Sequence, residues 1–261
     1  MVSKLLRSYL LALALLFIVL TNPGARADLI YTAQSSTANS DGPVEAQGTF
    51  TPGNGVITIV LQDLQSGIHS AGQEVSQLLF SVGGGLPTPT GFTQLQGNTI
   101  SFAKNGSVSG TGFDSASGPG SGPLLHWGFA TSSGNVTLET VGNVAAGGQP
   151  NHMIVGPNPN PNASLHNFNP HFADSATFTL TEPGVTSSTV LTASEIFNVQ
   201  IGFGTGPEAV LEAVLVSQNT PVPEPRTIAM LLSGGVCTAG VLACRRWKRR
   251  CSFQVSRRKR G

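Results

Sequence analysis

The central part of the chain alternates apolar and polar residues with a period of two, and this pattern limits its possible folds more than any other feature. Successive side chains of a β-strand point to opposite faces of a sheet, so such alternation indicates half-buried strands. Four windows show it, and their apolar residues are Leu125, Trp127 and Phe129; Val136 and Leu138; Ala176, Phe178 and Leu180; and Phe197, Val199, Ile201 and Phe203. We therefore expect a fold built mainly from strands.

Other segments carry weaker strand patterns. Residues 56–61 are apolar on both faces and are bounded by Gly55 and by polar residues, which is typical of a strand in the centre of a sheet. Ile100 with Phe102, and residues 210–216, predict additional strands.

One spacing favours a helix instead. Apolar residues that recur three, four and seven positions apart share one face of a helix. The spacing predicts a short helix that begins near Ser70 and has on its apolar face Val75, Leu78, Leu79 and Val82.

Clusters of glycine and proline separate these runs, at residues 83–85, 118–123 and 156–161. Short strands between such turns predict two packed antiparallel sheets. The expected fold class is all-β, an antiparallel β-sandwich or jelly-roll-like domain over residues 28–218. We find no repeat of fixed period that would indicate a solenoid.

The charges of the chain are strongly segregated. All 13 acidic residues lie between Asp28 and Glu224, and Lys104 is the one cation in residues 28–225, so this region carries a formal charge of −12. An acidic surface repels phosphate backbones, which argues against nucleic-acid binding. The three cysteines, Cys237, Cys244 and Cys251, lie near the C-terminus, so a domain over 28–218 must be stabilised by its own core.

The first 27 residues have the order of a secretory signal peptide. Lys4 and Arg7 provide a positive start, residues 9–20 form an apolar run, and Ala25 and Ala27 occupy the small-residue positions of a cleavage site. We expect the export machinery and signal peptidase to act here, so that the mature chain begins at Asp28. An uncleaved membrane anchor is the alternative.

A second apolar segment lies near the other end of the chain. Residues 228–244 are 17 residues without a charge, and as a helix they would span about 25 Å, the short limit for crossing a bilayer. A basic cluster in the tail 245–261 follows directly, and such clusters stay on the cytoplasmic side. The cluster consists of Arg245, Arg246, Lys248, Arg249 and Arg250.

The linker 219–227 completes a pattern that resembles the PEP-CTERM sorting signal of bacterial surface proteins. The pattern is a P-E-P motif, then an apolar helix, then a basic cluster, and its motif residues here are Val222, Pro223, Glu224, Pro225 and Thr227. The resemblance implies an exosortase, a membrane transpeptidase that recognises the motif and removes the tail after transient inner-membrane insertion. It implies delivery to the cell surface or to the extracellular matrix of a biofilm, with extracellular polysaccharide as a possible partner. A second basic group, residues 257–260, departs from the pattern, and a permanent single-pass anchor is the alternative.

Candidate metal ligands are sparse. His166, His171 and Asp174 lie in one long polar loop, but their spacing matches no zinc pattern and prolines interrupt the loop. The acidic residues are scattered and form no calcium-binding loop. We expect neither a metal nor another cofactor.

Catalytic motifs are likewise missing, so we expect a protein that is not an enzyme. The sequence has no G-x-S-x-G motif. Carboxylate pairs that could meet in one cleft are Asp63 with Glu74 and Glu195 with Glu208. A carbohydrate-binding module is the other alternative, with its ligand in loops 118–123 or 145–174. Trp127, the one tryptophan of the exported region, is expected in the core.

Overall fold

The computed structural model describes residues 28–36, 41–118, 124–140, 150–186, 189–206 and 209–218, and within them the fold is all-β. Two single-turn 3₁₀ helices accompany the strands, η1 (Ala71–Gln73) and η3 (Leu165–Phe168). In chain order the strands are β1 (Leu29–Ser35), β2 (Val44–Pro52), β3 (Val56–Asp63), β4 (Val75–Val82), β5 (Gly91–Phe102), β6 (Val108–Ser117), β7 (Gly128–Ser132), β8 (Asn135–Glu139), β9 (Ile154–Val155), β10 (His171–Ala173), β11 (Ser175–Thr181), β12 (Ile196–Phe203), β13 (Ala209–Glu212) and β14 (Val214–Gln218).

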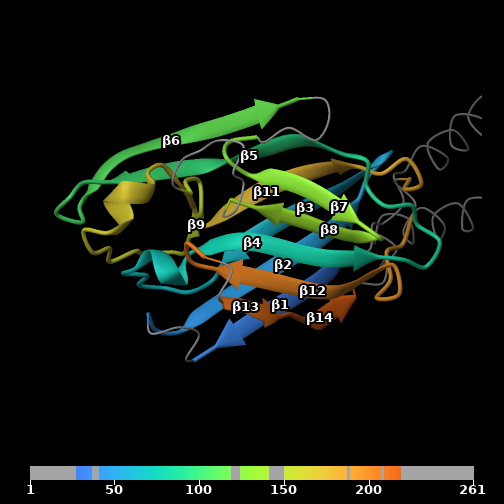
Figure 1. Ribbon diagram of the computed structural model, residues 1–261, viewed down its shortest axis with the longest axis horizontal. Coiled ribbons are helices and arrows are strands. Elements are labelled where there is room, and N and C mark those ends of the chain that lie inside the picture. Colours follow the sequence, from blue (N-terminus) through green and yellow to red (C-terminus); the bar gives the residue numbers. More distant parts are fainter. Residues whose placement is uncertain are drawn as a thin grey trace, which may run out of the picture. The chain divides into compact units, whose positions relative to one another are not determined.

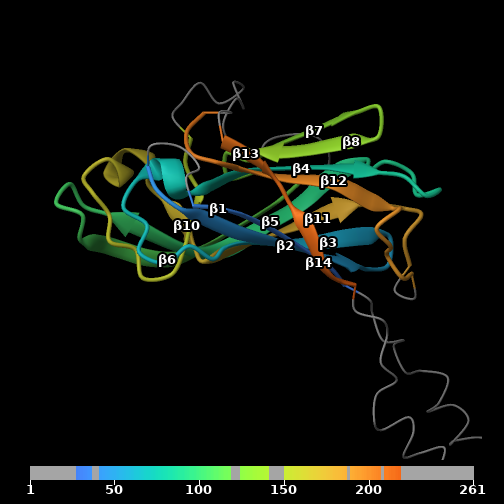
Figure 2. The ribbon, with the colours of Figure 1, turned by 90° about the horizontal axis from the view of Figure 1, so that it is seen from below.

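The strands form two layers that pack face to face (Figures 1 and 2). One layer has the order β13-β12-β4-β8-β7, and the other has the order β14-β1-β2-β3-β11-β5-β6. The short strands β9 and β10 connect them, because β9 pairs with β4 and β10 pairs with β5. Neighbouring strands are antiparallel except for β9 and β10, which pair in parallel. The expected β-sandwich character is therefore present, with one parallel pair that the sequence did not indicate.

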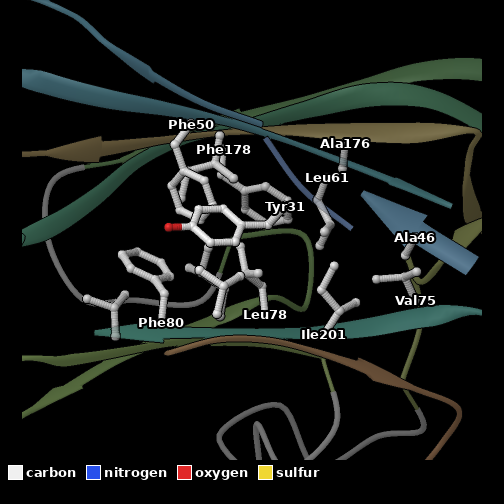
Figure 3. Packing of buried hydrophobic residues seen from close by; sticks show 14 of the residues in the cluster. Tyr31, Ala46, Phe50, Leu61, Val75, Leu78, Phe80, Ala176, Phe178 and Ile201 are labelled. Carbon is white, nitrogen blue, oxygen red and sulfur yellow. The ribbon is translucent and has the colours of Figure 1, made fainter. Parts of the chain in front are cut away.

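The hydrophobic core lies between the two layers (Figure 3). Phe50 of β2 and Phe80 of β4 meet edge to face across it, with ring centroids 5.1 Å apart. Phe178 of β11 contacts Trp127 in the same way at 4.8 Å. All four side chains are at most 1% exposed, and burying each stabilises the fold by about 1.5–3 kcal/mol before entropy costs.

Most strand predictions are confirmed. The alternating windows at Val136 and Ala176 are β8 and β11, with their apolar side chains buried. Residues 56–61 belong to β3, which lies between β2 and β11 as expected of a central strand and continues to Asp63. Ile100 and Phe102 end β5. Residues 210–216 form two strands, β13 and β14, which are separated at Ala213.

The helix predicted around residues 75–82 is wrong, because this segment is strand β4. Hydrogen bonds to β12 on one edge and β8 on the other hold it in the centre of its layer. Gln77 and Leu79 on the outer face are half-buried, while Leu78 and Phe80 face the core. Leu78, Phe80 and Val82 alternate with Gln77, Leu79 and Ser81, so the period of two is present, and the apolar Leu79 on the outer face created an accidental helical spacing.

Two of the alternating windows differ in part from the prediction. Leu125 and Phe129 are half-buried, and Leu124 and Trp127 close a tight turn in which Leu125 and His126 have positive φ angles of 47° and 65°. The strand β7 begins only after this turn. In β12 the alternation is interrupted at Asn198, where the register shifts.

Glycines permit the turn between β4 and β5, as predicted for residues 83–85. Gly84 has a φ of 63°, and a Cβ atom there would lie 2.7 Å from the Cγ of Glu195. A larger residue would be strained in both backbone and packing. Residues 156–161 form a loop after β9, as expected, and of residues 118–123 only Gly118 is described.

Within the described part of the chain, we find no helix with the length and apolarity needed to span a bilayer. The predicted signal peptide 1–27, linker 219–227, transmembrane segment 228–244 and tail 245–261 lie outside the described residues.

Candidate functional site

Of the residues predicted for signal cleavage and sorting, the structure describes one. Asp28 is half-buried and directly precedes β1. The others lie outside the described residues, and they are Ala25, Ala27, Val222, Pro223, Glu224, Pro225, Thr227, Arg245, Arg246, Lys248, Arg249 and Arg250.

The histidines considered as metal ligands have other roles. His171, the first residue of β10, is fully buried. The His166 Nδ1 atom lies 2.8 Å from the carbonyl oxygen of Phe102. Asp174 follows β10, and its N–H donates to the carbonyl of Val155. Among the residues that the structure describes, no three His, Cys, Asp or Glu side chains are grouped so that they could hold a metal ion.

His171 instead forms a buried ion pair. Its Nδ1 atom lies 2.8 Å from Oε1 of Glu74, and both side chains are 0% exposed. Its Nε2 atom lies 3.0 Å from the carbonyl oxygen of Leu165, to which it donates. Glu74 connects η1 to β4, and its carbonyl accepts from the N–H of Gly204. The pair joins segments nearly one hundred residues apart and holds them at one end of the domain.

Asp63 is a third buried ionisable group in this region. It ends β3 with 1% of its surface exposed, and its Oδ1 accepts the N–H of Gln65 at 2.9 Å. Burial raises the pKa of Asp63 well above its ordinary value, and the charges of Glu74 and Asp174 act in the same direction. Asp63 therefore keeps its proton to a higher pH than an ordinary aspartate does.

The paired groups titrate under opposing influences. Burial raises the pKa of Glu74, although the charge and the hydrogen bond of His171 oppose this effect. Burial lowers the pKa of His171, but Glu74 and the Leu165 carbonyl outweigh burial, and the net pKa shift is upward. Each of the two groups therefore keeps its proton to a higher pH than an ordinary side chain of its type.

Of the carboxylates considered for catalysis, the structure describes Asp63, Glu74 and Glu195. Asp63 and Glu74 are close enough to interact electrostatically, as the sequence allowed, but neither exposes a reactive atom to solvent. Glu195 accepts hydrogen bonds from the N–H and Oγ1 of Thr192 at 2.7 and 2.9 Å, which stabilises the turn before β12. Glu208 lies outside the described residues.

Trp127 is a core residue, as predicted. Its side chain is fully buried, and Nε1 donates a 2.9 Å hydrogen bond to the carbonyl of His152. The His152 ring in turn contacts Asp114 of β6, with 3.0 Å between Nε2 and Oδ2. Burial lowers the pKa of His152 despite the nearby Asp114 carboxylate. These contacts fix the turn before β7 and leave no aromatic platform at Trp127.

An accessible candidate site is a groove of about 670 Å³ along β4, β8, β12 and β13. We call it the β12 groove. Three of its polar residues lie on adjacent strands and contact one another. The Ser81 Oγ donates to Oδ1 of Asn135 at 2.7 Å, and Nδ2 of Asn198 lies 3.4 Å from Ser81 Oγ. Gln200 and Glu212 occupy opposing positions on β12 and β13 and also line it.

A β-bulge shapes the β12 groove. Asn198 has a positive φ of 50° inside β12, and the pairing of β12 with β4 shifts between Phe197 and Gln200. In consequence Ile196 is buried, Phe197 is half-buried and Asn198 is exposed. Bulges often redirect side chains beside binding sites, and asparagine tolerates this backbone conformation better than most residues.

The sequence did not predict the β12 groove. In the loops considered for a saccharide, the described residues, 118 and 150–174, contribute none of the residues that line it. The sequence feature that could have indicated a site is the polar side of the alternating window at residues 197–203, which contains Asn198 and Gln200. That signal cannot indicate which neighbouring strands complete the site.

No protein-family model matches this chain, and no curated protein does.

Proposed function

We propose that the chain is a non-enzymatic, exported bacterial protein of the cell surface or extracellular matrix. A signal peptide over residues 1–27 directs export, and the C-terminal segment sorts the protein after transient insertion in the inner membrane. The observation that carries the proposal is the order of the P-E-P motif at 223–225, the uncharged run 228–244 and the cations that begin at Arg245.

The chemistry of the motif is consistent with recognition by a membrane transpeptidase of the exosortase type. Pro223 and Pro225 prevent a helix from extending back out of the membrane, so the segment stays extended and accessible. Glu224 offers a charge between them. The basic cluster keeps the tail on the cytoplasmic side, which places the motif and the preceding domain outside.

The exported part, in this proposal, is an antiparallel β-sandwich or jelly-roll-like module. Three observations support such a role. The domain has no cysteine and is stabilised by its own core. Its first and last strands are neighbours, with Leu29 opposite Gln218, so the two ends of the described domain lie side by side. Its interacting carboxylates, Asp63 and Glu74, are buried, which is unsuited to acid–base catalysis.

Cell fractionation of motif variants tests sorting. In a bacterium with an exosortase, we expect the unchanged protein to leave the inner membrane in a shortened form. The triple variant Pro223→Ala/Glu224→Ala/Pro225→Ala should remain full-length in the membrane. Pro221→Ala is the matched control and should behave like the unchanged protein. If the unchanged protein also remains full-length in the membrane, the chain is a permanent single-pass protein and the sorting proposal is wrong.

A further inference from the structure

We propose that the β12 groove binds a segment of a neutral polysaccharide. The inference assigns a ligand to the domain that the proposed function exports, and it concerns residues of that domain alone. It therefore holds or fails whether or not the C-terminal tail is removed.

The β12 groove contains amide groups that can bind hydroxyls of a ligand. Ser81 is hydrogen-bonded to both Asn135 and Asn198, and these bonds occupy Oδ1 of Asn135 and Nδ2 of Asn198. This leaves Nδ2 of Asn135 as a donor and Oδ1 of Asn198 as an acceptor, neither with a partner among the described residues. The Gln200 amide likewise has no side-chain partner there. Adjacent hydroxyls of a sugar both donate and accept, and amides match them in both roles.

The β12 groove also has an apolar part on which a sugar ring can pack. Phe197 and Leu79 are half-buried and line it beside the amides. A sugar ring presents C–H groups on one face and hydroxyls at its rim, so it can pack on the phenyl ring while its hydroxyls reach the amides. A volume of about 670 Å³ falls within the range of about 300–1,000 Å³ that is usual for small-molecule sites.

Charge decides between neutral and acidic ligands. Lys104, the one lysine or arginine of the described residues, is exposed in the turn between β5 and β6 and does not line the groove. Glu212 does line it. Phosphate groups and uronic acids would meet a carboxylate and no counter-charge, so they are disfavoured.

The groove is also held in shape before a ligand arrives. The bulge at Asn198 fixes its backbone at a φ of 50°, and the 2.7 Å bond between Ser81 and Asn135 orients the neighbouring amide. Preorganised polar groups lose less entropy on binding, which favours recognition of a flexible polymer.

Saturation-transfer NMR titration of the full chain tests the inference. The protein is kept in a zwitterionic detergent, because a detergent with a sugar headgroup would compete. The probes are neutral tetrasaccharides of glucose and of mannose, and a tetrasaccharide of glucuronic acid. We expect a neutral probe to bind and the acidic probe to bind more weakly or not at all.

Variants locate the binding. Asn198→Gly retains a residue that accepts positive φ but removes the amide, and Gln200→Ala removes the second amide. Each substitution should raise Kd about three- to tenfold, as expected for one lost hydrogen bond. Asn98→Ala, at an exposed position of β5 outside the groove, is the matched control and should leave Kd unchanged. Circular dichroism verifies that each variant is folded.

Three results would overturn the inference: no neutral tetrasaccharide binds, the acidic probe binds more tightly than the neutral ones, or the groove variants bind as well as the unchanged protein. None of these results bears on processing of the tail, which the fractionation experiment reads separately.

Discussion

Tyr31 donates its hydroxyl hydrogen to the carbonyl oxygen of Ile196 across 2.5 Å and so joins β1 in one layer to β12 in the other. The Tyr31 side chain is 4% exposed, and burial raises the pKa of its hydroxyl. Its ring also packs edge to face on Phe50, with centroids 5.9 Å apart. One side chain therefore connects the core, both layers and the strand that carries the bulge of the β12 groove.

Tyr31→Phe should lower the free energy of unfolding by about 1–2 kcal/mol. The ring packing is retained, but the Ile196 carbonyl loses its buried donor. Urea denaturation of the full chain in detergent, followed by circular dichroism, measures the change. An unchanged denaturation midpoint would show that the bond between the layers contributes nothing to stability.

Phe178→Ala should destabilise the domain by about 3–5 kcal/mol, because it removes a fully buried ring that contacts Phe92 and Trp127. Phe113→Ala is the matched control. Phe113 is 60% exposed on β6, and its replacement should change stability by less than about 0.5 kcal/mol. Equal effects of the two substitutions in thermal unfolding would contradict the assigned core.

The buried ion pair predicts non-additive substitutions. Glu74→Leu alone leaves His171 buried without its partner and should cost about 3–5 kcal/mol. Adding His171→Phe removes the orphaned ring, so the double variant should be more stable than the sum of the single effects predicts. A double-mutant cycle from denaturation midpoints measures the coupling. Strict additivity would show that the two side chains do not interact.

Stability should fall as the pH rises. The folded-state pKa values of Asp63, Glu74 and His171 are all raised, so the folded state binds more protons than the unfolded state. The loss begins for Asp63 above its ordinary pKa of 3.8 and for His171 above 6.5. His152 has the opposite effect, because its folded-state pKa is lowered. The stability that it contributes is lost as the pH falls below 6.5.

Asp63→Asn isolates one contribution to this pH dependence. The variant keeps an oxygen that can accept from Gln65 N–H, but it does not titrate. Denaturation between about pH 5 and about pH 8 should therefore show a smaller loss of stability than in the unchanged protein. Glu212→Gln, at an exposed position, is the control. A slope unaffected by Asp63→Asn would mean that this carboxyl does not titrate differently on folding.

Local patterns predicted the strands whose two faces differ. Thr177 and Thr179 alternate with the buried Phe178 and Leu180 in β11, and the expected strand is found. The same reasoning failed in β4, because Leu79 is apolar although it lies on the half-buried outer face, next to the core-facing Leu78. An apolar residue on the outer face of a strand can therefore imitate the spacing of a helix.

The candidate site depends on contacts between distant segments. Ser81 and Asn198 are 117 residues apart and meet only because β4 and β12 pair. Glu74 and His171 are likewise joined by tertiary structure. These polar residues belong to no sequence motif, so their partners can be identified only from the folded structure. The predicted addressing segments are continuous in the sequence, so their patterns could be recognised from the sequence alone.

Intact mass spectrometry of the protein recovered from outside the inner membrane tests the central claim, export followed by sorting, most directly. We predict a mature chain that begins at Asp28 and lacks the basic tail after the P-E-P motif. A major species that still extends to Gly261 would contradict this account.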